Sequence, residues 1–422
     1  MKKRQKITAM LLCAVLGGVM LLNFAGCSAD IRAADLMENI EANAIGGKAA
    51  DETFIQAYAD FAVELFKKSA DPEQNSLISP LSVLLALAMT ANGADTQTKA
   101  EMEAVLGRTI PLEELNEYLY TYVKNLPSNE KYKVEIANSI WFREDAQTLE
   151  VRQEFLQKNA DYYSAAAYKS AFDAQTVKDI NRWVNDKTDG MIDGIVDEID
   201  PLTVMYLINA LVFDAEWQTV YNKKDIYDGV FKSYLGAEHT VEMMCSDEYG
   251  YLRDESAVGF LKNYYDGKYC FAALLPNEGI PIENYIASLT GSGLRAVISN
   301  AESASVMARL PKFSYDYTVT MNRALQEMGM QAAFSGENAD FSKLGDSPLG
   351  NIYIGAVLHK TFISVDERGT KAGAVTKVGM EANSVEPSEP YIVTLDRPFV
   401  YAIIDNSTNL PVFLGTVLDI AK

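Results

Sequence analysis

The sequence predicts an α+β fold built as a single large domain. The main observation is a nearly continuous apolar run at 202–213, LTVMYLINALVF, which is typical of a strand buried on both faces at the centre of a large sheet. Segments at 53–70 and 75–107 carry helical spacing and helix-start residues instead, so helices and a sheet are both expected. The chain has 422 residues and 48% of them are hydrophobic, which is enough to bury a large core. Length alone allows two or three domains, but no internal repeat divides the chain.

The N-terminus is expected to be a targeting segment and a tether. Residues 1–26 combine a basic start with an apolar run, 7–22, that is shorter than the roughly 20 residues of a membrane-spanning helix. The run ends in Phe-Ala-Gly-Cys, which resembles a bacterial lipoprotein signal with Cys27 as the lipidated new N-terminus; ordinary signal cleavage is the alternative. Residues 27–50 are polar and rich in Ala and Gly, as in a tether, and 51–422 form the folded domain. The protein is therefore expected to be exported, either held at the cell surface through a lipid anchor at Cys27 in the membrane or secreted.

Charge and motifs exclude several classes of function. The net charge of −21 argues against nucleic acid as a partner. No CxxC, HExxH, GxSxG or P-loop pattern occurs, so we expect no metal, no cofactor and no enzymatic activity. Two cysteines remain in the body, Cys245 and Cys270. Both lie in apolar, strand-like stretches, which favours free thiols over a disulfide.

The elements of the body follow in order. From 53 to 70, apolar residues recur at helical spacing, at Phe54, Tyr58, Phe61 and Leu65. The stretch 75–107 holds a Ser-Pro helix start, a helix that is apolar all round, a Gly-containing break and an amphipathic helix. An apolar strand is predicted at 136–142 and an amphipathic helix at 180–192. The last part, 396–420, predicts two apolar strands about an Asn-Ser-Thr turn.

The stretch 352–390 carries two conflicting patterns. Small side chains alternate along one side of a two-residue period, at Thr370, Ala372, Ala374, Thr376, Val378 and Met380. This pattern predicts a strand with one small face that can be buried and one wet face. The residues that follow, 383–390, include two prolines and are unfavourable in a strand. The combination indicates a loop that lies outside a sheet in one state and inside a sheet in another.

Several of these motifs resemble the serpin family. The segment 367–376, ERGTKAGAVT, is similar to the hinge of the serpin reactive-centre loop, and 75–107 is similar to a dense family pattern in the first half. LQEMGMQAAFS at 325–335 and DRPFVYAIIDNSTNLPVFLGTVLDI at 396–420 also match. The resemblance runs from about Asp51 to the end of the chain. It implies a single domain of three β-sheets and about nine helices with an exposed reactive-centre loop, and a monomer.

The resemblance also implies roles for particular residues. The hinge comprises Glu367, Gly369, Thr370, Lys371, Ala372, Gly373, Ala374, Val375 and Thr376. Four polar residues match the shutter, beneath the middle of the main sheet where strands must part: Ser79, Ser82, Asn209 and His359. Three match the breach, at the top of the sheet, with an ion pair between the last two: Trp217, Lys312 and Glu367. Lys371 stands where the family has an acid and Gly373 where it has alanine, but both fall on the wet face. Asp214 and Ala215 replace a basic residue and a glycine.

The implied activity is suicide inhibition of a protease, whose cut loop inserts into the main sheet. The family's usual loop length places the reactive bond at Asn383–Ser384. Bonds after Met380, Ala382 and Val385 are the alternatives. Small neutral residues in this region favour an elastase- or subtilisin-like serine protease, with an Asn-preferring cysteine protease second. The alternative function is a non-inhibitory serpin that acts as a surface binding protein.

Overall fold

A computed structural model describes residues 31–144, 149–200, 203–347, 351–370 and 389–420. The chain divides into two compact units, Met1–Arg32 and Ala33–Lys422, and the described helices and strands belong to the second. The predicted signal segment and Cys27 lie outside the described residues. None of the described helices is long and apolar enough to cross a membrane.

Three large sheets organise the second unit. The main sheet has the strand order β1 (Ala34–Asp35), β5 (Ala166–Ser170), β3 (Tyr132–Arg143), β6 (Met205–Glu216), β16 (Gly369–Thr370), β15 (Ala356–Val365) and β13 (Phe313–Thr320). The second sheet has the order β2 (Ser76–Ile78), β19 (Leu410–Val417), β18 (Phe399–Asp405), β11 (Tyr269–Pro276), β10 (Ala257–Asn263) and β9 (Tyr251–Arg253). The third has the order β17 (Tyr391–Thr394), β12 (Val306–Pro311), β8 (Glu238–Glu248) and β7 (Ile226–Lys232). A two-stranded sheet joins β14 (Gly345–Asp346) to β4 (Glu150–Val151). The predicted α+β fold with three sheets is confirmed, with this small sheet in addition.

Nine α-helices occur in the part of the chain that the structure describes. They are α2 (Glu52–Ser69), α3 (Pro80–Ala91), α4 (Thr96–Leu106), α5 (Leu112–Asn125), α6 (Gln153–Tyr163), α7 (Ala174–Lys187), α8 (Ile282–Ser288), α9 (Gly291–Ser299) and α10 (Asn322–Glu327). The helix predicted to be apolar all round is α3, and every residue of it is buried. The helix predicted at 180–192 is α7, which starts six residues earlier because Asp173 and Thr176 form a capping box.

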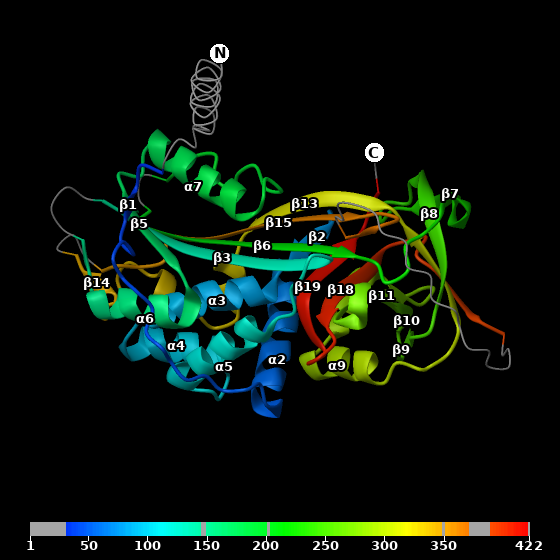
Figure 1. The fold of residues 1–422 in the computed structure, drawn as a ribbon, viewed down its shortest axis with the longest axis horizontal. Helices are drawn as coiled ribbons and strands as arrows, with labels where there is room; N and C mark the ends of the chain where they lie inside the picture. Colours follow the sequence, from blue (N-terminus) through cyan, green and yellow to red (C-terminus); the bar gives the residue numbers. More distant parts are fainter. Residues whose placement is uncertain (1–30, 145–148, 201–202, 348–350, 371–388, 421–422) are drawn as a thin grey trace, which may run out of the picture. The chain divides into compact units, whose positions relative to one another are not determined.

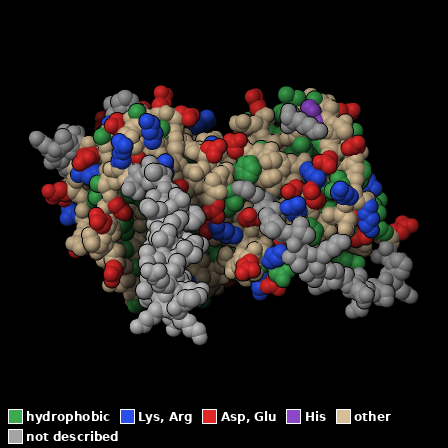
Figure 2. All heavy atoms as spheres, turned by 45° about the horizontal axis from the view of Figure 1, so that its top comes forward, with side chains coloured by type: hydrophobic (Ala, Val, Ile, Leu, Met, Phe, Trp, Pro, Cys, Tyr) green, Lys and Arg blue, Asp and Glu red, His purple; other side chains and the backbone are tan. Residues whose placement is uncertain are grey.

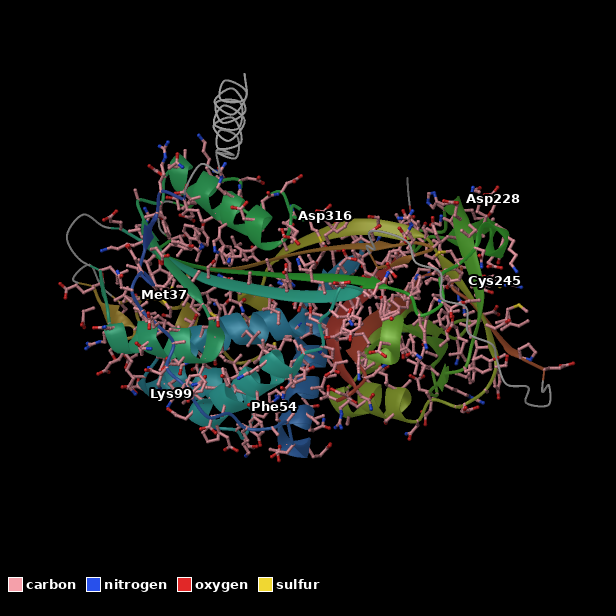
Figure 3. All side chains as sticks on the ribbon, in the orientation of Figure 1. Met37, Phe54, Lys99, Asp228, Cys245 and Asp316 are labelled. Atoms are coloured by element: carbon pink, nitrogen blue, oxygen red, sulfur yellow. The ribbon has the colours of Figure 1, made fainter. Side chains whose placement is uncertain are left out.

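The buried strand predicted at the centre of the chain is confirmed. It is β6, whose first nine residues are all buried, and it pairs with β3 from Met205 to Ala215. In Figure 1, α7 lies on one face of the main sheet, while α3 and the neighbouring helices cover the other face. The side chain of Phe54, labelled in Figure 3, is 1% exposed and stacks on Tyr118. Figure 2 shows Lys and Arg interspersed with Asp and Glu over the visible face, so the negative charge is not gathered in one place there.

Residues 33–50 lie against the body, which differs from the tether predicted for 27–50. β1 pairs antiparallel with β5 at the edge of the main sheet, close to Met37, which is labelled in Figure 3. Further along, the backbone N–H of Asn43 donates to Asp161 at 2.7 Å and that of Lys48 to the carbonyl of Glu117 at 3.1 Å. These contacts are long-range and mostly made by the backbone, so a polar, Ala/Gly-rich composition carries no sign of them. The tether therefore does not describe residues 33–50.

The two cysteines of the body are free, as the sequence favoured. Cys270 is buried in β11, and burial raises the pKa of its thiol to about 12. The thiol is therefore protonated and chemically quiet at neutral pH.

Candidate functional site: the seam between two strands of the main sheet

The parallel strands β6 and β15 are joined over only part of their length. They pair from Tyr206 and Ala356 to Asn209 and His359. Above that point, no ladder pair in the described residues joins the two strands directly. At the top, the two residues of β16 lie between them instead. We call this boundary the seam: its lower half is closed and its upper half is parted.

Four polar side chains meet at the upper end of the closed half. The backbone N–H of Ser79 donates to Nε2 of His359 at 3.0 Å, and Nδ1 of His359 contacts Oδ1 of Asn209. The Ser82 hydroxyl lies 3.4 Å from the same Asn209 oxygen, and the Asn209 amide donates to the carbonyl of Leu358 at 3.3 Å. All four side chains are fully buried. The structure therefore brings the four residues together. Ser79 and Ser82 come from the start of α3, Asn209 from β6 and His359 from β15.

Burial keeps His359 neutral. It lowers the pKa of the imidazole to about 3. Nε2 accepts from Ser79, so in the neutral ring Nδ1 carries the hydrogen and donates to Asn209. A second proton would face the Ser79 N–H, so the arrangement is specific for one neutral tautomer.

The short strand β16 fills the top of the seam. Thr370 pairs with Val365 of β15 on one side and with Ala215 of β6 on the other. A Cβ atom on Gly369 would lie 1.9 Å from the carbonyl oxygen of Ala215, so only glycine permits this close approach. Two hinge residues therefore already occupy a place between the strands.

The residues just before β16 are held by a segment that follows β6. The indole Nε1 of Trp217 donates to the carbonyl of Asp366 at 2.9 Å, and its backbone N–H donates to that of Arg368 at 2.7 Å. The backbone N–H of Tyr221 donates to the carbonyl of Glu367 at 3.0 Å. The carbonyls of three consecutive residues, 366–368, are thus bound by residues 217–221, which we call the anchoring segment.

The aromatic pair of Tyr264 and Trp217 holds the side chain of Thr370 in β16. The hydroxyl of Tyr264 lies 2.5 Å from that of Thr370, and its ring stacks on Trp217 with centroids 4.5 Å apart. Tyr221 and Tyr264 could not be identified from the sequence. No local pattern marks them, because Tyr264 meets the hinge across 106 positions of the chain.

The ion pair at the breach is partly exposed. Nζ of Lys312 lies 2.8 Å from Glu367 and 3.3 Å from Glu242, and the Lys312 side chain is 22% exposed. Contact with Lys312 lowers the pKa of Glu367. Burial lowers the pKa of Lys312, but Glu367 and Glu242 outweigh it and the net direction is upward. Lys312, Glu367 and Trp217 therefore lie at one end of the seam, Trp217 through its bonds to Asp366 and Arg368.

The rest of the predicted loop lies outside the described residues. This holds for the hinge residues Lys371, Ala372, Gly373, Ala374, Val375 and Thr376. It also holds for Asn383 and Ser384 at the expected reactive bond and for Met380, Ala382 and Val385 at the alternative bonds.

A small hollow opens at the parted half of the seam, between Leu211–Phe213 on β6 and Phe362–Ser364 on β15, with Met191 and Ile192 over it.

A family model described as serpin (serine protease inhibitor) matches residues 56–420, nearly all of the described body. The chain belongs to the serpin family. Its members are mostly protease inhibitors rather than catalysts, although some are non-inhibitory binders. Among its relatives, leukocyte elastase inhibitor A of Mus musculus is 28% identical over 380 residues, which covers 85% of this chain and 97% of the mouse protein.

Solved serpin structures agree with the fold. The thermophilic serpin tengpin in its native state is 55% identical and superposes with a TM-score of 0.88, covering 92% of this chain and 99% of tengpin. The same protein in its latent state gives 0.79 over 89% of this chain and 100% of that one. The structure described here is therefore closer to the native state. Thyroxine-binding globulin in complex with thyroxine is 25% identical, with a TM-score of 0.76 over 87% of this chain and 99% of that one.

Proposed function

We propose that this serpin traps a serine protease covalently and that its cleaved loop enters the seam as a new strand. The observation that carries the proposal is the seam itself, which is parted above Asn209 and His359 and already holds Gly369 and Thr370 between its strands. A strand added below Thr370 would complete a ladder whose edges are in place on both sides.

In this proposal, the added strand continues the register of β16. Gly369 opposes Glu216 and Thr370 opposes Ala215, so an antiparallel continuation brings residue 376 level with Asn209. The pairing of Thr370 with Val365 independently brings residue 376 level with His359. The hydroxyl of Thr376 would thus arrive between the two residues that close the seam, where it can replace their mutual hydrogen bond.

The same continuation decides which side chains become buried. Thr370 points inward and is 2% exposed, so Ala372, Ala374, Thr376, Val378 and Met380 would follow it inward. These are small or apolar side chains and none is charged. Insertion therefore buries apolar surface and makes backbone hydrogen bonds at little steric cost.

On the opposite face, Lys371 would lie level with Asp214 of β6. The family pattern has an acidic residue at position 371 and a basic residue at position 214. This chain has the reverse, a lysine at 371 and an aspartate at 214. We infer that the two substitutions compensate and that the inserted strand gains an ion pair there.

The chemistry of trapping uses the protease's own nucleophile. Its serine hydroxyl attacks the carbonyl carbon of Asn383, the bond to the nitrogen of Ser384 breaks, and that nitrogen leaves as a free amine. The ester that remains links the protease to the segment ending at Asn383. Insertion of that segment carries the protease away before water hydrolyses the ester. Cleavage after Met380, Ala382 or Val385 would follow the same course with a different strand length.

The target that we propose is an elastase- or subtilisin-like protease. Asn383 and its neighbours are small and neutral, which suits a shallow specificity pocket. The similarity to mouse leukocyte elastase inhibitor A supports the first of these two classes. An asparagine-preferring cysteine protease remains the second class. We further propose that the protein acts as a monomer outside the cell, held by a lipid at Cys27 or released.

A binding protein is the alternative function, and the similarity to thyroxine-binding globulin favours it. In that case the loop would be cut without trapping the protease. The uncharged, mostly small inward face of residues 370–380 weighs against it.

The test is to incubate residues 28–422 with neutrophil elastase, with subtilisin and with an asparagine-preferring cysteine protease. A complex that survives boiling in detergent, together with a released peptide beginning at Ser384, is the expected result. Cleavage by each protease without a complex, and with the protease still active, would overturn the inhibitory proposal in favour of the binding protein.

A further inference from the structure

A buried ion pair lies beneath the anchoring segment. Lys262, near the end of β10, has a side chain that is only 2% exposed, and its Nζ lies 2.7 Å from Oε1 of Glu248, which is 14% exposed. A lysine is rarely buried to this degree without a partner, because removing its charge from water is costly. Glu248 is that partner here, and the two side chains form their ion pair away from the surface.

The ammonium group of Lys262 also contacts the anchoring segment. Nζ lies 3.5 Å from the carbonyl oxygen of Thr219, 4.3 Å from the ring centroid of Tyr221 and 5.3 Å from that of Trp217. A desolvated ammonium group is attracted to both aromatic faces. Burial lowers the pKa of Lys262, but Tyr221 and Glu248 outweigh it, so the group stays charged.

Glu248 is itself held in place. The hydroxyl of Ser246 donates to the same carboxylate oxygen at 2.6 Å and lies 3.2 Å from the hydroxyl of Tyr221. Next to this group, the backbone N–H of Gln218 donates to the carbonyl of Asn263 at 3.0 Å. The anchoring segment is therefore held by one cation and its carboxylate, together with the backbone bond to Asn263.

We propose that Lys262 is a positioning residue for loop insertion: with Glu248 it fixes residues 217–221, which hold the carbonyls of residues 366–368 and keep β16 in the seam. Loss of the pair loosens the anchoring segment, and Gly369 and Thr370 then leave the seam more often. Insertion of the cut loop then starts later, so a larger fraction of the ester is hydrolysed before the protease is trapped. This role rests on the inhibitory function proposed above.

The test uses Lys262→Met, which keeps the length and volume of the side chain, in the full body of the protein. Because this variant leaves Glu248 unpaired, which is unfavourable for folding, the double variant Lys262→Met with Glu248→Gln removes both charges. Arg295→Met is the control for removing a paired cation, since Arg295 of α9 pairs with Glu52 of α2. For each protein we would measure the rate of first cleavage, the number of inhibitor molecules consumed per protease trapped, and hydrogen exchange over 366–370.

For both Lys262 variants we expect a cleavage rate within twofold of the parent, at least fivefold more inhibitor consumed per protease, and at least tenfold faster exchange over 366–370. The control should change neither of the last two. A lower unfolding temperature with unchanged exchange and unchanged consumption would overturn the proposal, because it would mean a merely structural pair. If the parent traps no protease, the inhibitory function fails, and exchange over 366–370 alone still decides whether Lys262 positions the hinge.

Discussion

The two halves of the seam differ in how β6 and β15 are held relative to each other. In the lower half, β6 and β15 are hydrogen-bonded directly, and uncharged buried groups end the pairing at Asn209 and His359. In the upper half, the same strands are held apart by two residues of a third segment, which in turn depends on aromatic and charged side chains outside the sheet. The lower half is therefore a lock that a new strand must open. The upper half is the entrance, and it is already occupied by the start of that strand.

The largest effect is expected from a charge at the entrance. Thr370→Arg would place a guanidinium where the side chain is 2% exposed and lies against Tyr264. Burying an unpaired charge costs several kcal/mol, so insertion should fail. We expect the protein to become a substrate, with more than ten molecules cleaved per protease trapped on titration. Thr370→Ser keeps the hydroxyl and is the control; equal trapping by the Arg variant would show that Thr370 does not turn inward during insertion.

A smaller but still clear effect is expected from Gly369→Ala. The added Cβ would lie 1.9 Å from the carbonyl of Ala215, so β16 must leave the seam. Hydrogen exchange at 369–370 should speed up, and several-fold more inhibitor should be consumed per protease. Gly46→Ala, where nothing lies within 4 Å of the added atom, is the control. Unchanged exchange in the Ala variant would mean that the entrance is not held by this close approach.

The free energy of unfolding should fall at acid pH because of His359. His359 has a pKa of about 3 in the folded protein against an ordinary 6.5, so below pH 6.5 the unfolded chain binds a proton that the folded state does not. This contribution to stability is complete above pH 6.5 and is lost as the pH falls toward 3, at about 1.4 kcal/mol per pH unit. His359→Gln can accept from Ser79 and donate to Asn209 without titrating. Urea unfolding at pH 7, 6 and 5 should show a steeper loss for the parent than for the Gln variant, and parallel losses would contradict the assignment.

The smallest effect concerns the outward face of the inserted strand. If Lys371 meets Asp214 on insertion, Lys371→Glu should raise the amount of inhibitor consumed by about two- to fivefold, which corresponds to the ~0.5–1 kcal/mol of a partly exposed pair. Adding Asp214→Lys restores the opposite charges and should restore trapping. A double variant no better than the single one would count against the proposed register.

Much of this comparison could be predicted from the sequence, because it depends on patterns that repeat along the chain. The apolar run at 202–213 identified β6, and the resemblance to the family identified Asn209 and His359 as candidates. The anchoring contacts could not be predicted. Lys262 lies near the end of β10 and Tyr264 directly follows it, with no spacing that points to the hinge. Their roles arise only when β10 is folded against residues 217–221. The packing of residues 33–50 was missed for a similar reason, since backbone pairing with a distant edge strand leaves no mark on composition.

The central claim is that the upper half of the seam receives a strand after the loop is cut. Hydrogen exchange measured by mass spectrometry before and after cleavage tests it most directly, on peptides that cover 210–214 of β6 and 360–364 of β15. Amides in both segments should become strongly protected after cleavage, while those of β18 and β19 in the second sheet should not change. Unchanged exchange in 210–214 and 360–364 after complete cleavage would contradict it.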